Sequence, residues 1–135
     1  MTTLVLISED DFATDELGVS TLRCTQSSSA KVAAHLRSQE ITEPLILLAG
    51  SDRAAWLPAI ALSQRAQGRR IAGYLVIDPI DITTTNEWPD APVIALISPD
   101  SSNSAHFARL RGWHVLPTGP NPPGQLLAEA LDYLG

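Results

Sequence analysis

The sequence PLILLAGSDRAAW occupies residues 44–56 and predicts a buried strand, a tight turn and the start of a helix. Leu45–Ala49 is an unbroken apolar run, which is typical of a strand covered on both faces of a parallel sheet. We expect Gly50 to pivot the turn, and we expect a helix over about 55–67 that ends at Gly68. This strand–turn–helix unit indicates an α/β protein.

Pro58 affects where that helix begins. A helix that started directly after Asp52 would lose an internal hydrogen bond at the proline, so it begins nearer Trp56 or is kinked. In the first case Ser51, Asp52 and Arg53 form a loop between strand and helix.

The rest of the chain repeats the alternation of apolar runs and helical patterns. Further strands are expected at Thr3–Ser8, Val19–Cys24, Ile71–Asp78, Pro92–Ser98 and Trp113–Pro117. Further helices are expected from Ser27, Ser28 or Ser29 to about Gln39, from Ser102 or Asn103 to Gly112, and after Pro122–Pro123 with Leu127, Ala130, Leu131 and Leu134 on one face. The segment 19–24 alternates apolar and polar residues, which favours an edge strand. We therefore predict one α/β domain over residues 1–135, a three-layer sandwich around a mostly parallel sheet of about six strands.

Composition excludes several function classes. The 135 residues carry a net charge of −6, which argues against binding to the phosphate backbone of nucleic acids. Cys24 is the single cysteine, so neither an internal disulfide nor a cysteine-rich metal site is expected. No apolar run approaches the length of about 20 residues that a membrane helix needs. Residues 1–8 have no basic region before their apolar run, so we do not expect them to be a signal peptide. We expect a cytoplasmic protein without a cofactor, with Mg²⁺ binding at Glu9, Asp10 and Asp11 as an alternative.

Residues 50–54 resemble the nucleophile turn of the α/β-hydrolase superfamily, whose pattern is Gly-x-nucleophile-x-Gly. Gly50 takes the first glycine, Asp52 the nucleophile and Ala54 the second glycine. Three later segments are similar, in order and spacing, to strands and the terminal helix of its small thioesterase-like members. These are Gly73–Pro79, Pro92–Asp100, and Trp113–Gly119 followed by the 126–134 helix. The resemblance implies a nucleophile after the third strand, an acid near Asp100 and a histidine after the last strand.

The chain departs from that pattern at the positions that carry the chemistry. Residues 118–122, where the family places its histidine, contain no imidazole. The connection from Asp78 to Pro92 is too short for a helical lid. Residues 8–11 run Ser-Glu-Asp-Asp where an oxyanion loop is expected, and negative charge there would oppose an oxyanion. The resemblance therefore implies a small, lidless member with a degenerate catalytic triad.

Four residues are candidates for residual catalysis. Asp52 or Ser51 would be the nucleophile, with His106 replacing the lost histidine and Asp100 as its partner. Each has a structural alternative: Asp52 and Ser51 can cap or begin a helix, and His106 can be a solvated helix residue.

Four other residues are candidates for contacts with a ligand: Gly50, Arg53, Asp78 and Trp88. Arg53 would bind a carboxylate or phosphate, or else pair with Asp78 or Asp100. Trp88 would roof a small pocket, or else be a packing residue. We expect a degenerate hydrolase-like protein that binds a small acyl-type ligand or a protein partner at the carboxyl ends of the strands. The alternatives are a thioesterase-like enzyme and a homodimeric structural module that pairs through an edge strand.

Overall fold

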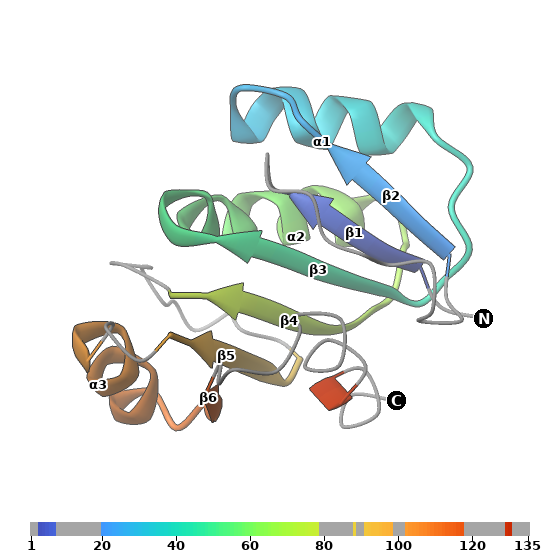
Figure 1. The fold of residues 1–135 in the computed structure, drawn as a ribbon. Coiled ribbons are helices and arrows are strands. Elements are labelled where there is room, and N and C mark those ends of the chain that lie inside the picture. The colour runs from blue at the N-terminus through green and yellow to red at the C-terminus, as the bar shows by residue number, and fades with distance from the viewer. Residues whose placement is uncertain are drawn as a thin grey trace.

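A computed structural model describes residues 3–7, 20–78, 88, 91–98, 102–117 and 129–130, without the side chains of residues 51, 52, 102 and 117. Ten elements follow one another in this part of the chain (Figure 1). They are β1 (Thr3–Ile7), β2 (Ser20–Cys24), α1 (Ser29–Ser38), β3 (Leu45–Gly50), the 3-10 helix η1 (Ser51–Trp56), α2 (Leu57–Ala66), β4 (Ile71–Ile77), β5 (Val93–Ile97), α3 (Ser102–Leu110) and β6 (His114–Pro117). The predicted strands are confirmed with ends that differ by one residue at most.

The six strands form one sheet in the order β2-β1-β3-β4-β5-β6, and every pair is parallel. Their arrowheads consequently point to one side of the molecule in Figure 1. This confirms the α/β class and the parallel sheet, and it confirms β2 as an edge strand. From β1, the chain first adds β2 on one side of the sheet and then adds β3 and the later strands on the other side. The sheet therefore has a topological switch point between β1 and β3.

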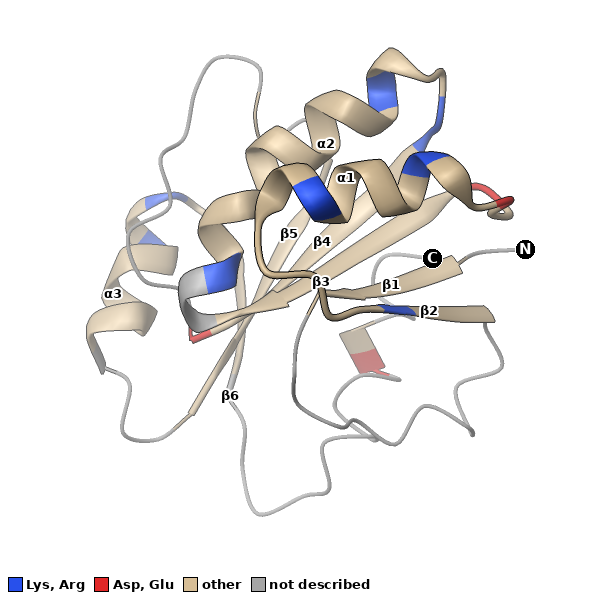
Figure 2. Ribbon diagram, turned by 90° about the horizontal axis from the view of Figure 1, so that it is seen from above, with Lys and Arg blue, Asp and Glu red and all other residues tan. Residues whose placement is uncertain are grey.

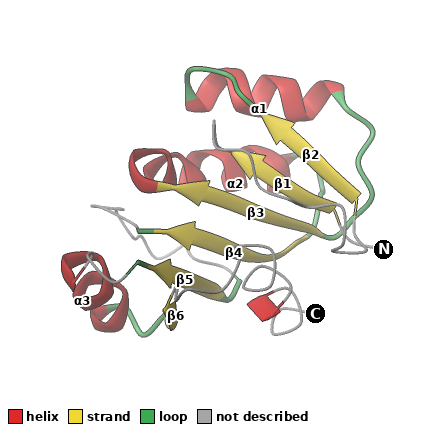
Figure 3. Cartoon of the chain, viewed as in Figure 1, coloured by secondary structure: helices red, strands yellow, loops and turns green. Residues whose placement is uncertain are grey.

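The three described α-helices cover one face of the sheet, as Figure 3 shows. Residues of α1, α2 and α3 form a single buried cluster with the strand residues on that face. The opposite face forms a second cluster, from Leu4 and Leu6 in β1 to Ile94 and Leu96 in β5. Ala130 packs against this second cluster. It belongs to the predicted terminal helix, of which residues 129 and 130 are helical and the remainder lies outside the described residues.

The predicted ends of the helices are confirmed where the structure describes them. The Ser28 hydroxyl oxygen accepts a hydrogen bond from the Lys31 backbone N–H at 3.2 Å, so Ser28 is the N-cap of α1. Gly68 follows α2 with φ of +79°, and Gly112 follows α3 with φ of +71°. Both glycines adopt the left-handed conformation that ends many helices.

Arg69 ties the ends of α1 and α2 together. Its guanidinium donates hydrogen bonds of 2.6 Å to the carbonyl oxygens of Leu36 and Gln39 and to Oε1 of Gln64. The two carbonyls lie at the carboxyl end of α1, where backbone acceptors lack helical partners. Gln64 is fully buried on α2, so one cation satisfies acceptors of both helices.

Candidate functional site

The carboxyl edge of the sheet gathers several of the predicted site residues. Gly50 is paired with Ile77, and Ile77 is paired with Leu96, in the ladders that join β3, β4 and β5. The β3–η1 turn, Asp78 and Ser98 therefore leave the sheet close to the same level. In open parallel sheets, ligands bind outside the carboxyl ends of the strands near the switch point, which here is bordered by β3.

The β3–η1 turn lacks the tight elbow of the hydrolase pattern, and α2 begins at Leu57, as Pro58 predicts. The chain passes from β3 into η1 at Gly50, but Gly50 is extended, with φ of −111° and ψ of 148°, a conformation that any residue adopts. A Cβ at Gly50 would lie 3.7 Å from Cβ of Ile77, an ordinary contact, so no close approach requires glycine either. Ser51 and Asp52 continue into a 3-10 helix rather than a sharp, strained elbow. The physical reason is Pro58, which occupies the first turn of α2 and lets that helix begin only at Leu57.

Asp52 and Ser51 lie in the first turn of η1. The N-cap positions of η1 and α2 belong to Gly50 and Trp56, so Asp52 begins η1 as a first-turn residue, which is the structural alternative that the sequence offers. Ala54, at the position of the family's second glycine, is fully buried in the core. Its methyl group fills space that a glycine would leave for a closer approach of the helix.

Arg53 projects its guanidinium over the ring of Trp56, with Cζ 5.2 Å from the ring centroid. Its side chain is half-buried. A cation in this position is attracted by the face of the indole, which restricts the long side chain beside the β3–η1 turn. The arginine and lysine residues are spread over elements from β2 to α3 (Figure 2), and Arg53 is the one that η1 contributes.

Asp78 joins the ends of β4 and β5. Its Oδ1 accepts a hydrogen bond from the Ser98 backbone N–H at 2.8 Å, and its Oδ2 accepts one from the Ser98 hydroxyl at 2.9 Å. Its own backbone N–H donates to the carbonyl of Leu96 at 2.9 Å. Asp78 was a predicted site residue, whereas Ser98 was missed. The available signal was that Asp78-Pro79 and Ser98-Pro99 each follow an apolar strand directly.

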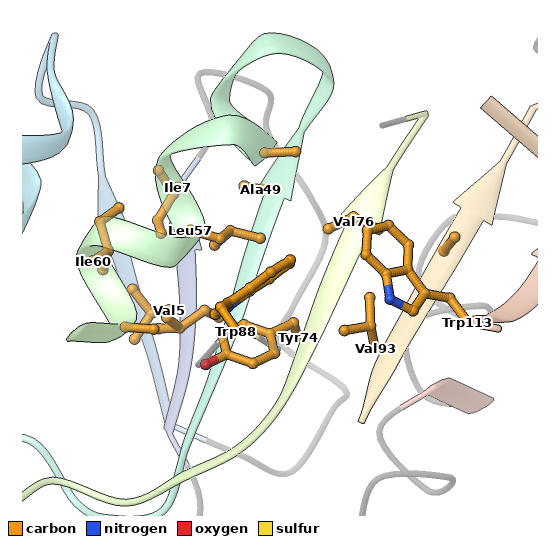
Figure 4. Packing of buried hydrophobic residues seen from close by; sticks show 14 of the residues in the cluster. Val5, Ile7, Ala49, Leu57, Ile60, Tyr74, Val76, Trp88, Val93 and Trp113 are labelled. Atoms are coloured by element: carbon orange, nitrogen blue, oxygen red, sulfur yellow. The ribbon is translucent and has the colours of Figure 1, made fainter. Parts of the chain in front are cut away.

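Neither His106 nor Trp88 lies with this group. His106 is exposed on α3. Trp88 is 2% exposed and lies in the core beside Tyr74 of β4, which favours packing over roofing a pocket at the edge (Figure 4). Its ring packs edge-on against Tyr74 at 5.1 Å and Trp113 at 6.0 Å between centroids. Asp100 and residues 8–11 and 118–122 lie outside the described residues, as do the side chains of Ser51 and Asp52.

The described residues do not support metal binding or thiol chemistry. Within the described ranges, no group of three or more histidine, cysteine, aspartate or glutamate residues could hold a metal ion. Cys24 is buried at the end of β2, and burial raises the pKa of its thiol to about 11. Such a thiol is poor in the reactive thiolate form.

Comparisons of the chain with protein families, with curated proteins and with solved structures found no match. Over the described residues, no helix combines the length and apolar character needed to cross a membrane.

Proposed function

We propose that this chain is a degenerate α/β-hydrolase-like binding protein that holds a small acyl-type ligand at the carboxyl edge of its sheet. The observation that carries the proposal is the all-parallel order β2-β1-β3-β4-β5-β6, with its switch point beside the β3–η1 turn. Such a switch point is where open α/β sheets bind ligands. Gly50 and Arg53 come at the end of β3, which borders the switch point, and Asp78 comes at the end of the adjacent β4.

Arg53 is the residue that would recognise the polar end of the ligand. A guanidinium binds a carboxylate through parallel N–H donors, and an acyl carbonyl through one of them. The contact with Trp56 reduces the entropy that the arginine would lose on binding, because its side chain is already restricted.

Binding without turnover follows from the backbone of the turn. An α/β-hydrolase needs its nucleophile raised on a strained elbow, with a histidine within hydrogen-bond reach. The 3-10 helix at 51–56 is not such an elbow, and residues 118–122 contain no histidine. A carboxylate nucleophile at Asp52 would also need a base to activate water for the ester intermediate.

The test is a calorimetric titration of the full chain with butyrate and with butyryl-N-acetylcysteamine, a small thioester. We expect binding of butyrate that Arg53→Gln weakens by about tenfold or more, since a charged hydrogen bond contributes roughly 1.5–3 kcal/mol. Arg109→Gln is the matched control, because Arg109 is exposed on α3. Absence of binding to both compounds would refute the proposal.

Hydrolysis of the thioester distinguishes the enzyme from the binding protein. We expect no turnover above the rate without protein. Turnover that Asp52→Asn or Ser51→Ala abolishes would replace the binding proposal with a thioesterase-like enzyme. His106→Ala then asks whether the exposed histidine takes part.

A further inference from the structure

The backbone at Asp78 is unusual for two reasons. Among the non-glycine residues that the structure describes, Asp78 alone has a positive φ, at 43°. The next residue is Pro79, and a residue before proline is normally confined to extended conformations. Aspartate tolerates the left-handed region better than most side chains, yet the conformation still costs free energy. Conformations of this kind persist where surrounding contacts impose them, and they are concentrated at functional sites.

The contacts that hold Asp78 also fix the direction of its carboxylate. Ser98 donates to both carboxylate oxygens, and the backbone N–H of Asp78 is fixed to Leu96. A carboxylate has about four lone-pair positions, so each oxygen can accept a further hydrogen bond. The side chain is half-buried, which leaves part of it open to solvent. Asp78 is thus an acceptor of fixed orientation rather than a freely rotating surface acid.

Asp78 follows β4, whose carboxyl end lies between those of β3 and β5, so its carboxylate belongs to the edge of the sheet where the ligand is proposed. Ile77 pairs with Gly50 across the β3–β4 ladder, so Asp78 follows directly beside the start of the β3–η1 turn. An ionised carboxylate only accepts hydrogen bonds, and it therefore favours a partner that donates them.

We infer that Asp78, oriented by Ser98, is a specificity-determining residue that selects acyl ligands bearing a hydrogen-bond donor near the acyl group. The inference rests on the proposed function and narrows its ligand class to hydroxyacyl or aminoacyl compounds. Ser98 acts through Asp78 as a positioning residue. No covalent step is involved.

The test compares three probes on the full chain by calorimetry: butyrate, 3-hydroxybutyrate and 3-aminobutyrate. We expect at least one donor-bearing compound to bind about tenfold more tightly than butyrate. The second and third probes distinguish a hydroxyl donor from an ammonium donor. Equal affinity for all three, or a preference for butyrate, would overturn the inference.

The variants assign the preference to this residue pair. Asp78→Gly removes the carboxylate while glycine accepts the left-handed backbone, so the preference for the donor-bearing probe should fall to about one. Ser98→Ala should reduce that preference in part, because it frees one carboxylate oxygen. Glu40→Gln, at an exposed acid away from the edge, is the matched control. A preference that survives Asp78→Gly would overturn the assignment.

A second variant and the pattern of binding to the three probes separate loss of folding from loss of specificity. If Asp78→Gly does not fold, Asp78→Asn serves instead, since asparagine also tolerates this backbone while its amide lacks the charge and one of the two acceptor oxygens. If butyrate binds and no donor-bearing probe is preferred, the specificity inference fails while the proposed function stands. If none of the three probes binds, the specificity inference fails, and the proposed function fails as well if butyryl-N-acetylcysteamine also does not bind.

Discussion

The effect of replacing Trp88 on the free energy of unfolding tests how this core is packed. Trp88 belongs to the buried cluster on the helix-covered face of the sheet, where it packs against Tyr74 of β4. It is 2% exposed and contacts two aromatic rings, Tyr74 and Trp113 (Figure 4). Trp88→Ala should therefore leave an indole-sized cavity in the middle of the helix-covered face.

The expected loss of unfolding free energy is about 3–5 kcal/mol, the usual cost of deleting a buried tryptophan side chain. The two edge contacts, at roughly 0.5–1.5 kcal/mol each, place the value in the upper part of that range. Trp88→Phe keeps one ring and removes about three buried heavy atoms. At about 0.8 kcal/mol for each carbon-sized group, it should cost roughly 2 kcal/mol.

Urea unfolding followed by far-ultraviolet circular dichroism measures these losses. Leu110→Ala is the control, because Leu110 is 71% exposed and its truncation should change stability by less than about 0.5 kcal/mol. Indole added to Trp88→Ala should restore about 1.4 kcal/mol at ten times its dissociation constant, since it binds the native state only. A loss below about 1 kcal/mol for Trp88→Ala, or the same loss as for Leu110→Ala, would refute the packing described here.

Three further predictions concern stability. Arg69→Ala should lower the unfolding free energy by about 2–3 kcal/mol, because it strands the buried Oε1 of Gln64 and removes a charged donor from the carbonyls of Leu36 and Gln39. Arg70→Ala, at an exposed side chain, should cost little, and a denaturant midpoint for each variant decides this. Ser28→Ala should cost about 1 kcal/mol in the same assay through loss of the α1 cap, and equal stability to wild type would contradict the capping role. Burial raises the pKa of the Cys24 thiol from an ordinary value of 9.0 to about 11. The folded state therefore binds this proton more tightly, so its contribution to stability is complete below about pH 9 and disappears as the pH rises to about 11. Cys24→Ala should reduce the decline of the denaturant midpoint over that window, and an unchanged decline would exclude Cys24 as its source.

Local patterns predicted the elements because each pattern depends on residues that are neighbours in the chain. The apolar run at 45–49 predicts a strand buried on both faces, and this is β3 with only Gly50 added. Ser28 and Gly68 predict helix ends through hydrogen bonds and backbone angles that span a few residues. The effect of Pro58 on the start of α2 is local in the same way.

The candidate site was only partly predictable. Asp78 was expected at the carboxyl edge because the end of a strand is visible in sequence. Its bond to Ser98 joins residues 20 positions apart, and nothing in either segment specifies that β4 and β5 are neighbours. The sharp elbow that the hydrolase resemblance implies at the β3–η1 turn is absent for a related reason. A glycine permits a pivot without requiring one, and the packing of Ala54 and Leu57 is compatible with an extended Gly50.

The amino-acid sequence alone therefore determines where strands and helices lie, which faces are apolar, and that an α/β sheet is formed, because periodicity and capping act over one or two turns of chain. Tertiary structure alone determines the strand order, the burial of Trp88 between Tyr74 and Trp113, and the left-handed backbone of Asp78. These features depend on register and packing between distant segments. Their free energy comes from contacts that exist only once the sheet has assembled.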